Sequence, residues 1–335
     1  MFPRRTLHGA LAIMAGVALL AGTAPAADAA TADFPAGYEG YHTYAEVTAE
    51  LQKTVANHPD LARLSSIGKS YQGRDLNLLT ISSGSGKPEV LFTCNQHARE
   101  HLTTEMCLHI VQRFTDGYGT DSKIKSMVDT HTIYVVPNVN PDGSEYDISG
   151  GRFHNWRKTR KPVPGSSAIG TDPNRNWDYE WGCCNGSSSN PSAEDYRGPS
   201  AFSEPETKAL ADFVDAHQIK AHIDFHTYSE LVLWPLGYTT SPTGPDMTQA
   251  QAQRFQSIGK SMAATNGYTP EQSSGLYITD GDIDDWAWGK HKILSFAFEM
   301  YPTGSNPGFY PDDSQIVPQT TRNDPAVDLL IAQAT

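Results

Sequence analysis

Short apolar segments that suit β-strands alternate with amphipathic helical segments along most of this chain. The expected strands cover residues 76–82, 89–93, 132–136, 220–226 and 294–300. The expected helices cover residues 43–58, 104–114, 204–217, 248–266 and 326–334. Strands that alternate with helices build one sheet with helices packed on both of its faces. The sequence therefore predicts an α/β protein.

Local signals fix several of these boundaries and leave one long irregular region. A capping box, Thr43-x-x-Glu46, begins the first helix, and Gly267 ends the helix at residues 248–266. Residues 143–200 are rich in Gly, Ser, Pro and Asn, and they also hold Trp, Arg and Tyr side chains. Irregular segments of this length are usually functional or disordered, and this composition indicates a functional one.

The first 30 residues have the features of a secretory signal peptide. Arg4 and Arg5 form a positive start, residues 10–21 are apolar, and small residues allow cleavage at Ala26 or Ala30. The arginine pair also permits export by a twin-arginine route. We expect a secreted, extracellular protein in which residues 31–335 form one domain.

Composition excludes several kinds of partner. The 335 residues carry 25 basic and 38 acidic side chains, and the net charge of −13 opposes binding to nucleic acid phosphates. After signal removal no apolar run reaches the ~20 residues that a membrane span needs, so no membrane partner is expected. In an oxidising compartment the four cysteines are expected to pair, and all three pairings remain open. Their spacings match no zinc-finger pattern.

Polar donors at the ends of predicted strands indicate a metal site. His97 and Glu100 closely follow the strand at 89–93, and His226 is the last residue of the strand at 220–226. Strand ends are where α/β folds keep their sites. Two histidines and one glutamate, with a fourth position open, form a catalytic zinc set. A solvated polar turn is the alternative for His97 and Glu100 taken alone.

A further carboxylate lies in an apolar strand. Glu299 is flanked by Phe298 and Met300, and burying an unpaired carboxylate is costly. Burial raises the pKa of a carboxyl group, which suits a general base that takes a proton from water. A structural ion pair is the alternative interpretation of Glu299.

Several short blocks extend this pattern over the whole chain after the signal. They are His97-Ala98-Arg99-Glu100, Asn140-Pro141-Asp142-Gly143, Asn155-Trp156-Arg157-Lys158-Thr159-Arg160, Asn174-Arg175-Asn176-Trp177, His226-Thr227-Tyr228-Ser229 and Phe298-Glu299. Tyr277 lies 22 residues before Glu299. In these blocks and their order the chain resembles the secreted zinc carboxypeptidases, the family of carboxypeptidases A and B, and in particular its bacterial carboxypeptidase T-like branch.

The resemblance implies a fold and an activity. The implied fold is a single catalytic domain over residues 31–335, with a mixed, mostly parallel, twisted sheet between helices. The implied activity is removal of single C-terminal residues from peptides or proteins by a monomer that holds one Zn²⁺. A structural calcium ion occurs in some bacterial relatives, but no loop in this sequence has a calcium-binding motif.

The resemblance also implies a role for each site residue. His97, Glu100 and His226 are the implied zinc ligands, with water in the open position. Glu299 is the implied base, and Arg157 the group that stabilises the transition-state oxyanion. The implied substrate contacts are Asn174 and Arg175 with the terminal carboxylate, Tyr277 over the bound residue, and Arg99 with a substrate carbonyl.

Specificity depends on the stretch Gly281-Asp282-Ile283-Asp284-Asp285-Trp286. In the family that the chain resembles, the residue two before this tryptophan lines the side-chain pocket, and Asp there accompanies preference for Lys or Arg. Asp284 holds that position, so we expect acceptance of Lys and Arg, with large apolar ends as a second class. Asp282 is a second acidic candidate. The alternative is that one of these residues caps the following helix.

The resemblance further implies a disulfide between Cys94 and Cys107, which leaves Cys183 and Cys184 as a vicinal pair.

Two other functions compete with carboxypeptidase activity on ordinary peptides. A peptidoglycan stem-peptide carboxypeptidase of the same superfamily is the first, although Arg175 and Asp284 favour ordinary peptide ends. A non-catalytic peptide-binding relative is the second, and the presence of all zinc ligands opposes it.

Overall fold

The computed structural model describes residues 33–335, and the predicted signal peptide at residues 1–30 lies outside this range. One mixed sheet of eight strands has the order β1-β2-β4-β3-β5-β8-β6-β7. The strands are β1 (Ala62–Lys69), β2 (Asp75–Ile81), β3 (Glu89–Cys94), β4 (Thr132–Val136), β5 (Ile219–Thr227), β6 (Leu231–Trp234), β7 (Thr269–Gln272) and β8 (Leu294–Met300).

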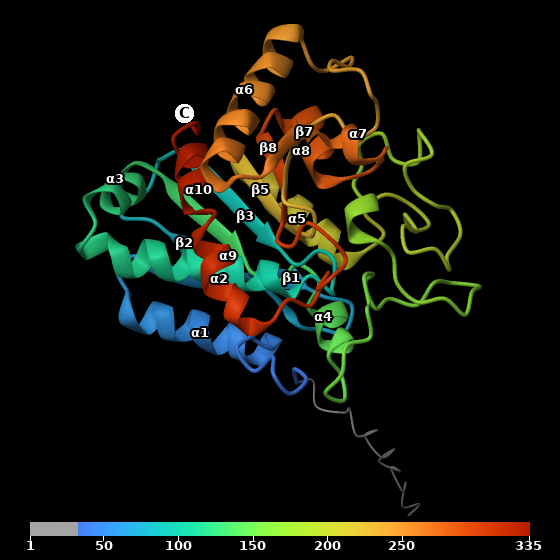
Figure 1. The fold of residues 1–335 in the computed structure, drawn as a ribbon, viewed down its shortest axis with the longest axis horizontal. Coiled ribbons are helices and arrows are strands. Elements are labelled where there is room, and N and C mark those ends of the chain that lie inside the picture. The colour runs from blue at the N-terminus through green and yellow to red at the C-terminus, as the bar shows by residue number, and fades with distance from the viewer. Residues whose placement is uncertain (1–32) are drawn as a thin grey trace, which may run out of the picture. The chain divides into compact units, whose positions relative to one another are not determined.

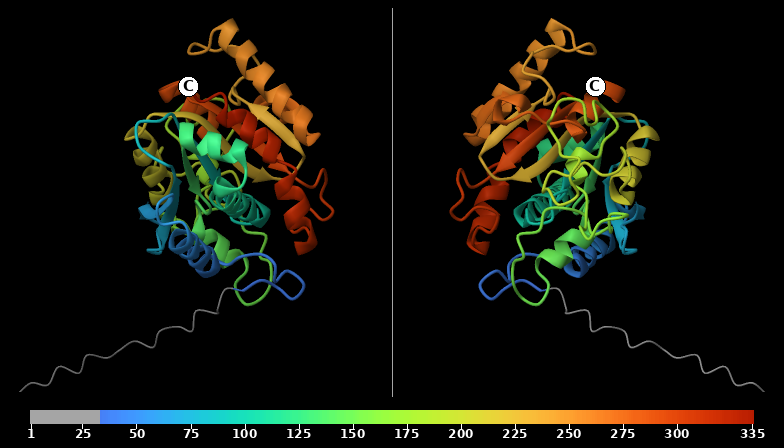
Figure 2. Two further views of the ribbon diagram at one scale, coloured as in Figure 1. Left: turned by 90° about the vertical axis from the view of Figure 1, so that its left-hand side faces the viewer. Right: turned by 90° about the vertical axis from the view of Figure 1, so that its right-hand side faces the viewer.

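Helices cover both faces of this sheet (Figures 1 and 2). The α-helices are α1 (Tyr44–Asn57), α2 (His101–Asp116), α3 (Ser122–Thr130), α4 (Pro141–Asp147), α5 (Pro205–Asp215), α6 (Gln249–Asn266), α7 (Ser273–Leu276), α8 (Ile283–His291), α9 (Ile316–Thr321) and α10 (Asp324–Ile331). Short 3₁₀ turns are η1 (Gly117–Gly119), η2 (Pro173–Arg175) and η3 (Asp313–Gln315). The predicted α/β fold is confirmed.

Side-chain alternation along the central strands builds two apolar layers. On β3, Val90 and Phe92 pack into the layer that includes α2, α6 and α10, whereas Leu91 packs into the layer of α5 and α8. Successive residues of a strand point to opposite faces, so a strand that is buried on both faces is apolar throughout. This is why the central parts of β3 and β4 are apolar runs in the sequence.

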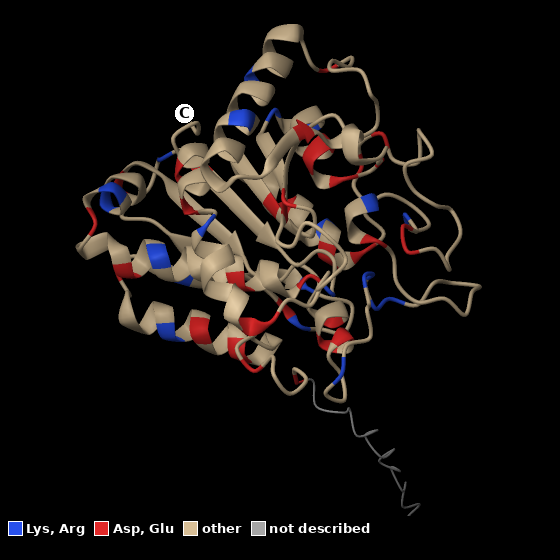
Figure 3. Cartoon of the chain, viewed as in Figure 1, with Lys and Arg blue, Asp and Glu red and all other residues tan. Residues whose placement is uncertain are grey.

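The sheet brings the predicted site residues to one edge. Strands β3, β5 and β8 are neighbours and run parallel, so their carboxyl ends lie at the same edge of the sheet. The segment between α4 and α5 is largely irregular and contributes Arg157, Asn174 and Arg175 to this end of the sheet (Figure 1, yellow-green loops). Acidic and basic residues are interspersed along the helices of the visible face, as in the Lys53–Glu50 pair of α1 (Figure 3).

One buried carboxyl group away from this edge makes stability depend on pH. Glu206 of α5 accepts a hydrogen bond from the backbone N–H of Tyr71 at 2.8 Å, and its Oε2 is buried without a partner among the described residues. Burial raises the pKa of Glu206 to about 7, from an ordinary value of 4.5. Between these values the folded protein binds more protons than the unfolded chain, so stability falls as pH rises from about 4.5 to about 7.

We therefore expect Glu206→Gln to stabilise the protein at pH 8 and to have little effect at pH 5. The glutamine imitates the protonated acid, and the shift corresponds to about 3 kcal/mol at pH 8. Urea unfolding of the two proteins at both pH values measures this difference. An equal difference at pH 5 and pH 8 would show that the charge of Glu206 is not the cause.

Candidate active site

The three predicted metal-ligand side chains converge at the carboxyl ends of β3 and β5. The Nδ1 atoms of His97 and His226 lie 3.1 Å apart, and each is 2.9 Å from an oxygen of Glu100. All three side chains are buried, and their donor atoms lie within 4.8 Å of one another. Two imidazole nitrogens and a carboxylate this close together fit a zinc ion, whose bonds to such donors are about 2.0–2.2 Å long.

The turn after β3 explains how His97 and Glu100 reach this position. Asn95 has a positive φ of 58°, which reverses the chain, and its amide donates to the carbonyls of His97 and Ala98 at 3.3 Å. Glu100 then precedes the first residue of α2. His226 lies within β5 itself, so its position is set by the strand pairing with β3 and β8.

Two aspartates that the sequence analysis missed hold the histidines from behind. His97 Nε2 lies 3.1 Å from Asp172, and His226 Nε2 lies 2.6 Å from Asp224. A carboxylate on the outer nitrogen fixes the tautomer and orientation of a metal-binding imidazole. A signal for Asp224 was available, because a residue two before His226 on a strand shares its face. Asp172 directly precedes the Pro173–Arg175 turn.

We expect Asp224→Asn to weaken zinc binding by about 10- to 100-fold, because the imidazole of His226 loses its anionic partner. Competition with a chromogenic chelator measures the zinc affinity of the purified protein without any reference to activity. Exposed Asp116→Asn serves as the matched control and should bind zinc like the parent protein. Unchanged zinc affinity in Asp224→Asn would contradict this role.

Glu299 of β8 lies opposite His226 in the parallel register of β5 and β8. Its Oε2 is buried and accepts no hydrogen bond from the described residues. Burial raises the pKa of Glu299 to about 7, while the nearby His226 lowers it. A buried carboxyl group with a free oxygen and a pKa near neutrality is equipped to accept and return a proton. It lines a small cavity of about 40 Å³ together with His97 and His226.

Arg157 is fixed beside His97 through a shared carboxylate. Its Nε and Nη2 donate to Asp172 at 3.0 and 2.8 Å, and the other oxygen of Asp172 contacts His97. Asp172 is fully buried, and the Arg157 guanidinium holds the pKa of that carboxyl well below its usual range, although burial alone would raise it. The arrangement locks one cation next to the metal ligands.

Arg175, Asn174 and Tyr277 line the same cavity as His97 and His226. The buried Arg175 donates from Nη1 to the carbonyl of Asn174 at 2.6 Å and from Nε to that of Gly186 at 3.1 Å. Asn174 accepts from the N–H of Ile283 at 2.9 Å, which ties it to the start of α8. Tyr277 is 50% exposed, and its ring lies 5.8 Å from the Arg175 guanidinium.

The two acidic specificity candidates both line this cavity but have different surroundings. Asp282 is the N-cap of α8, where it accepts from the N–H of Asp285 at 2.8 Å and from Thr279 at 2.6 Å. This matches the helix-capping alternative. Asp284 is buried and shares a short hydrogen bond with Ser295 of β8.

The remaining predicted residues lie around this centre. Arg99 stacks over Phe309 at 4.2 Å and forms an ion pair with Glu194 at 3.2 Å, and it lines a second cavity beside Arg157. The structure joins Cys94 to Cys107 and Cys183 to Cys184. Cys94 is the last residue of β3, so the first bridge attaches the strand below His97 to α2.

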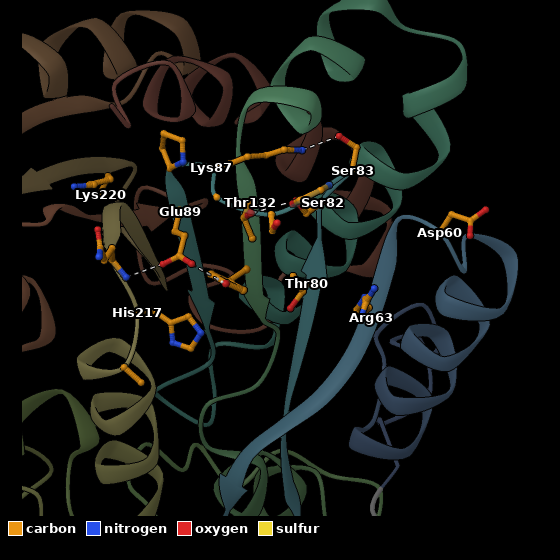
Figure 4. A pocket seen from close by; sticks show the side chains of 17 residues that line it. Asp60, Arg63, Thr80, Ser82, Ser83, Lys87, Glu89, Thr132, His217 and Lys220 are labelled. Atoms are coloured by element: carbon orange, nitrogen blue, oxygen red, sulfur yellow. Dashed lines mark hydrogen bonds between the residues drawn. The ribbon is translucent and has the colours of Figure 1, made fainter.

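A cavity of about 990 Å³ lies away from this site at the amino ends of β3, β4 and β5 (Figure 4). Its polar lining is already paired in part. Glu89 accepts from Tyr134 at 3.0 Å and from the N–H of Gln218 at 2.7 Å, and Lys87 donates to Ser83 at 2.7 Å. It contains no part of the His97, Glu100 and His226 set, which is at the opposite edge of the sheet.

Comparison with known proteins agrees with this geometry. A family model described as Peptidase_M14, zinc carboxypeptidase, matches residues 47–326. A zinc carboxypeptidase of Saccharothrix mutabilis subsp. capreolus is 55% identical over 312 residues, which cover 90% of this chain and 71% of the relative. Carboxypeptidase A2 of Mus musculus is 37% identical, with 84% of this chain and 67% of the relative covered.

A solved structure of thrombin activatable fibrinolysis inhibitor superposes with a TM-score of 0.80 at 30% identity, covering 88% of this chain and 74% of that chain. The chain therefore belongs to the zinc carboxypeptidase family, the class of metallopeptidases that the fold and site had indicated. It is an enzyme of this class, and the family uses one catalytic Zn²⁺. Among residues 33–335, no helix combines the length and apolar character that a membrane span requires.

Proposed function

We propose that this enzyme removes single residues from the C-termini of peptides and proteins, accepting Lys, Arg and large apolar residues, as a secreted monomer. One observation supports the proposal above others. Two of the proposed metal ligands, His97 and His226, border one cavity together with Glu299 and Arg175. The cavity therefore offers a metal site for the reacting carbonyl of the substrate, a proton acceptor, and a cation for the terminal carboxylate.

Substrate binding begins with the terminal carboxylate. The Nη2 of Arg175 has no hydrogen-bond partner among the described residues, so it is available to a planar carboxylate. Asn174 provides a neighbouring amide, and the exposed ring of Tyr277 is able to cover the bound residue. Arg99, at the cavity beyond Arg157, is placed to contact a carbonyl further along the peptide.

His97, Glu100 and His226 would hold the zinc ion, which supplies a Lewis acid that polarises the scissile carbonyl and makes water more acidic. Glu299 takes the proton of the attacking water on its free oxygen and returns it to the leaving amine. The pKa of about 7 suits both directions of transfer near neutral pH. Arg157, held in place by Asp172, donates to the oxyanion as negative charge develops.

The cavity that would receive the terminal side chain contains both acidic and apolar groups. Asp282 and Asp284 supply the acid, while Leu233, Leu276 and Ala297 supply the apolar lining. This mixture is the basis for accepting Lys and Arg as well as large apolar residues.

Export is supported by the signal-like residues 1–30, and the two disulfides suit an oxidising compartment.

The test is release of the last residue from blocked dipeptides that end in Arg, Lys, Phe, Leu or Glu. Release that a zinc chelator stops, with Arg, Lys, Phe and Leu cleaved well and Glu poorly, supports the proposal. A stem-peptide carboxypeptidase would instead ignore these peptides and cleave one that ends in a diamino acid. Binding without cleavage of any peptide by the zinc-loaded protein would favour the non-catalytic alternative.

A further inference from the structure

A continuous chain of buried hydrogen bonds runs behind the cavity from Asp284 to Asp224. The hydroxyl of Ser295 shares a hydrogen bond with Asp284, and its oxygen lies 2.7 Å from Nδ1 of His222. Nε2 of His222 lies 2.8 Å from the hydroxyl of Thr93, which donates to Asp224 at 2.6 Å. Each of these residues is no more than 4% exposed, and of the five only Asp284 lines the cavity.

The strand register produces this chain. Thr93 of β3 is the direct neighbour of Asp224 on β5, and His222 of β5 is the direct neighbour of Ser295 on β8. Asp284 reaches Ser295 from the first turn of α8. Because all five side chains come from the regular elements next to the site, their geometry does not depend on a loop.

Counting hydrogens shows that the chain holds an additional proton. Four hydrogen bonds join the five side chains. Thr93, Ser295 and a neutral His222 supply one hydrogen each, and ionised aspartates supply none. One bond would therefore lack a hydrogen, and two acceptors would face each other in a buried place, which is costly. A fourth proton on one of the titratable groups completes the chain.

The surroundings indicate where this proton resides. Asp224 also lies 2.5 Å from the amide of Gln96 and 2.6 Å from His226 Nε2, so three donors surround it and favour its ionised form. Burial lowers the pKa of His222 to about 4, which disfavours a charged imidazole. Burial also raises the pKa of Asp284 well above its usual value. Asp284 is thus the group that carries the proton.

We infer that Asp284 is a neutral acid while the pocket is free or holds an apolar side chain, and that it releases its proton when a Lys or Arg side chain enters. The inference rests on the proposed acceptance of basic C-terminal residues. A neutral acid is compatible with the apolar lining of Leu233, Leu276 and Ala297, whereas a buried cation beside it would lack a counter-ion. His222 and Ser295 then act on specificity as positioning residues. Their hydrogen bonds keep Asp284 neutral while an apolar substrate side chain is bound.

Other titratable groups border the pocket and must be separated from Asp284 by the experiment. The pocket lining holds Asp282 at the N-cap of α8, His97, His226, Glu299, Arg175 and Tyr277. Behind the lining, Asp224, Asp285 and His222 also act on Asp284 or contact it. Asp282 is the closest competitor, since it also lines the pocket, and burial raises its pKa as well. Its carboxylate already accepts hydrogen bonds from Thr279 and from the N–H of Asp285, and these lower its pKa.

The test is calorimetric binding of two peptides to the zinc-loaded Glu299→Gln enzyme, which is expected to bind without turnover. One peptide ends in arginine, and the other ends in citrulline, its uncharged isostere. Titration in buffers of different ionisation enthalpy counts the protons released. We expect the arginine peptide to release about one more proton than the citrulline peptide between pH 5.5 and 6.5. The arginine-to-citrulline affinity ratio should then rise by up to about tenfold per pH unit.

Variants test which side chain releases the additional proton when the arginine peptide binds. Asp284→Asn imitates the neutral acid, since its amide is able to donate to Ser295, and it should remove both the additional proton and the pH dependence of the affinity ratio. Asp282→Asn, which retains a good helix cap, should leave the additional proton in place. Ser295→Ala should shift the pH range over which the proton is released.

Three results would overturn the inference. The first is equal proton release for both peptides, and the second is loss of the additional proton in Asp282→Asn instead of Asp284→Asn. The third is failure of the arginine peptide to bind at any pH from 5.5 to 8.5. In that case acceptance of basic ends is also wrong, while cleavage of apolar ends would still support carboxypeptidase activity.

Discussion

Replacing Glu299 with Gln is expected to lower kcat by about 10³-fold, because the amide cannot accept the proton of the attacking water. The substitution keeps the size of the side chain and removes the ionisable oxygen that lies unpaired at the cavity. KM should change much less than kcat, since Glu299 takes no part in the proposed binding of the terminal carboxylate. Steady-state kinetics on one good peptide measures both quantities.

Zinc content and the unfolding midpoint are measured on the same preparations, so that a lost metal or a misfolded protein is recognised. Glu50→Gln is a suitable control, because Glu50 lies on the surface of α1 in an exposed ion pair with Lys53. Its activity should equal that of the parent enzyme. If zinc-loaded Glu299→Gln kept more than a tenth of the parent kcat, Glu299 would not be the base.

Replacing Arg175 with Ala should reduce kcat/KM for peptides with a free C-terminus by about 10²- to 10³-fold, as expected for a buried charge pair that loses one partner. The structure offers a sharper form of this test, which compares each free-acid peptide with its C-terminal amide. The parent enzyme should discriminate strongly against the amide. The Arg175→Ala enzyme should cleave both slowly and at similar rates.

This comparison separates a lost substrate contact from damage to the loop around Arg175. Arg175 also donates to the carbonyls of Asn174 and Gly186, so its removal could disturb the backbone nearby. A disturbed loop would lower activity on both peptides but would preserve the preference for the free acid. A preserved preference would therefore refute the assignment of Arg175 as the carboxylate-binding residue.

The central part of the fold could be predicted from sequence because burial on both faces leaves a clear pattern. Strand β8 has the predicted bounds, Leu294–Met300, and the capping box at Thr43 begins α1 as predicted. The metal-ligand set followed from the same logic, since its members are polar residues at the ends of apolar strands. Adjacent parallel strands then bring these carboxyl ends together at one edge of the sheet.

The outer elements could not be predicted, because their sequences carry no strong periodicity. Strand β1 is almost entirely exposed or half-exposed, and β7 is the four-residue segment Thr269–Gln272, which contains a proline. Helix α8 begins with buried acids, which a pattern of apolar residues does not detect. Strands β1 and β7 are held by pairing with the neighbouring strands β2 and β6.

The positions of the supporting aspartates depend on tertiary contacts. Asp172 contacts His97 across 75 residues of sequence, and Asp224 serves both His226 and Thr93. Similarly, Asp282 and Asp284 are two residues apart, yet one caps a helix and the other ends a buried hydrogen-bond chain. The sequence predicted acid in the pocket, but only the strand register reveals which partners control its charge.

The most direct test of the site is the zinc content of the parent enzyme beside that of His226→Ala, with peptide cleavage measured on the same samples. Elemental analysis after dialysis against a weak chelator should find one zinc per parent chain and less than a tenth of that in His226→Ala. Cleavage should fall in the same proportion. A His226→Ala protein that retained a full equivalent of zinc would contradict the assignment of His97, Glu100 and His226 as the zinc ligands.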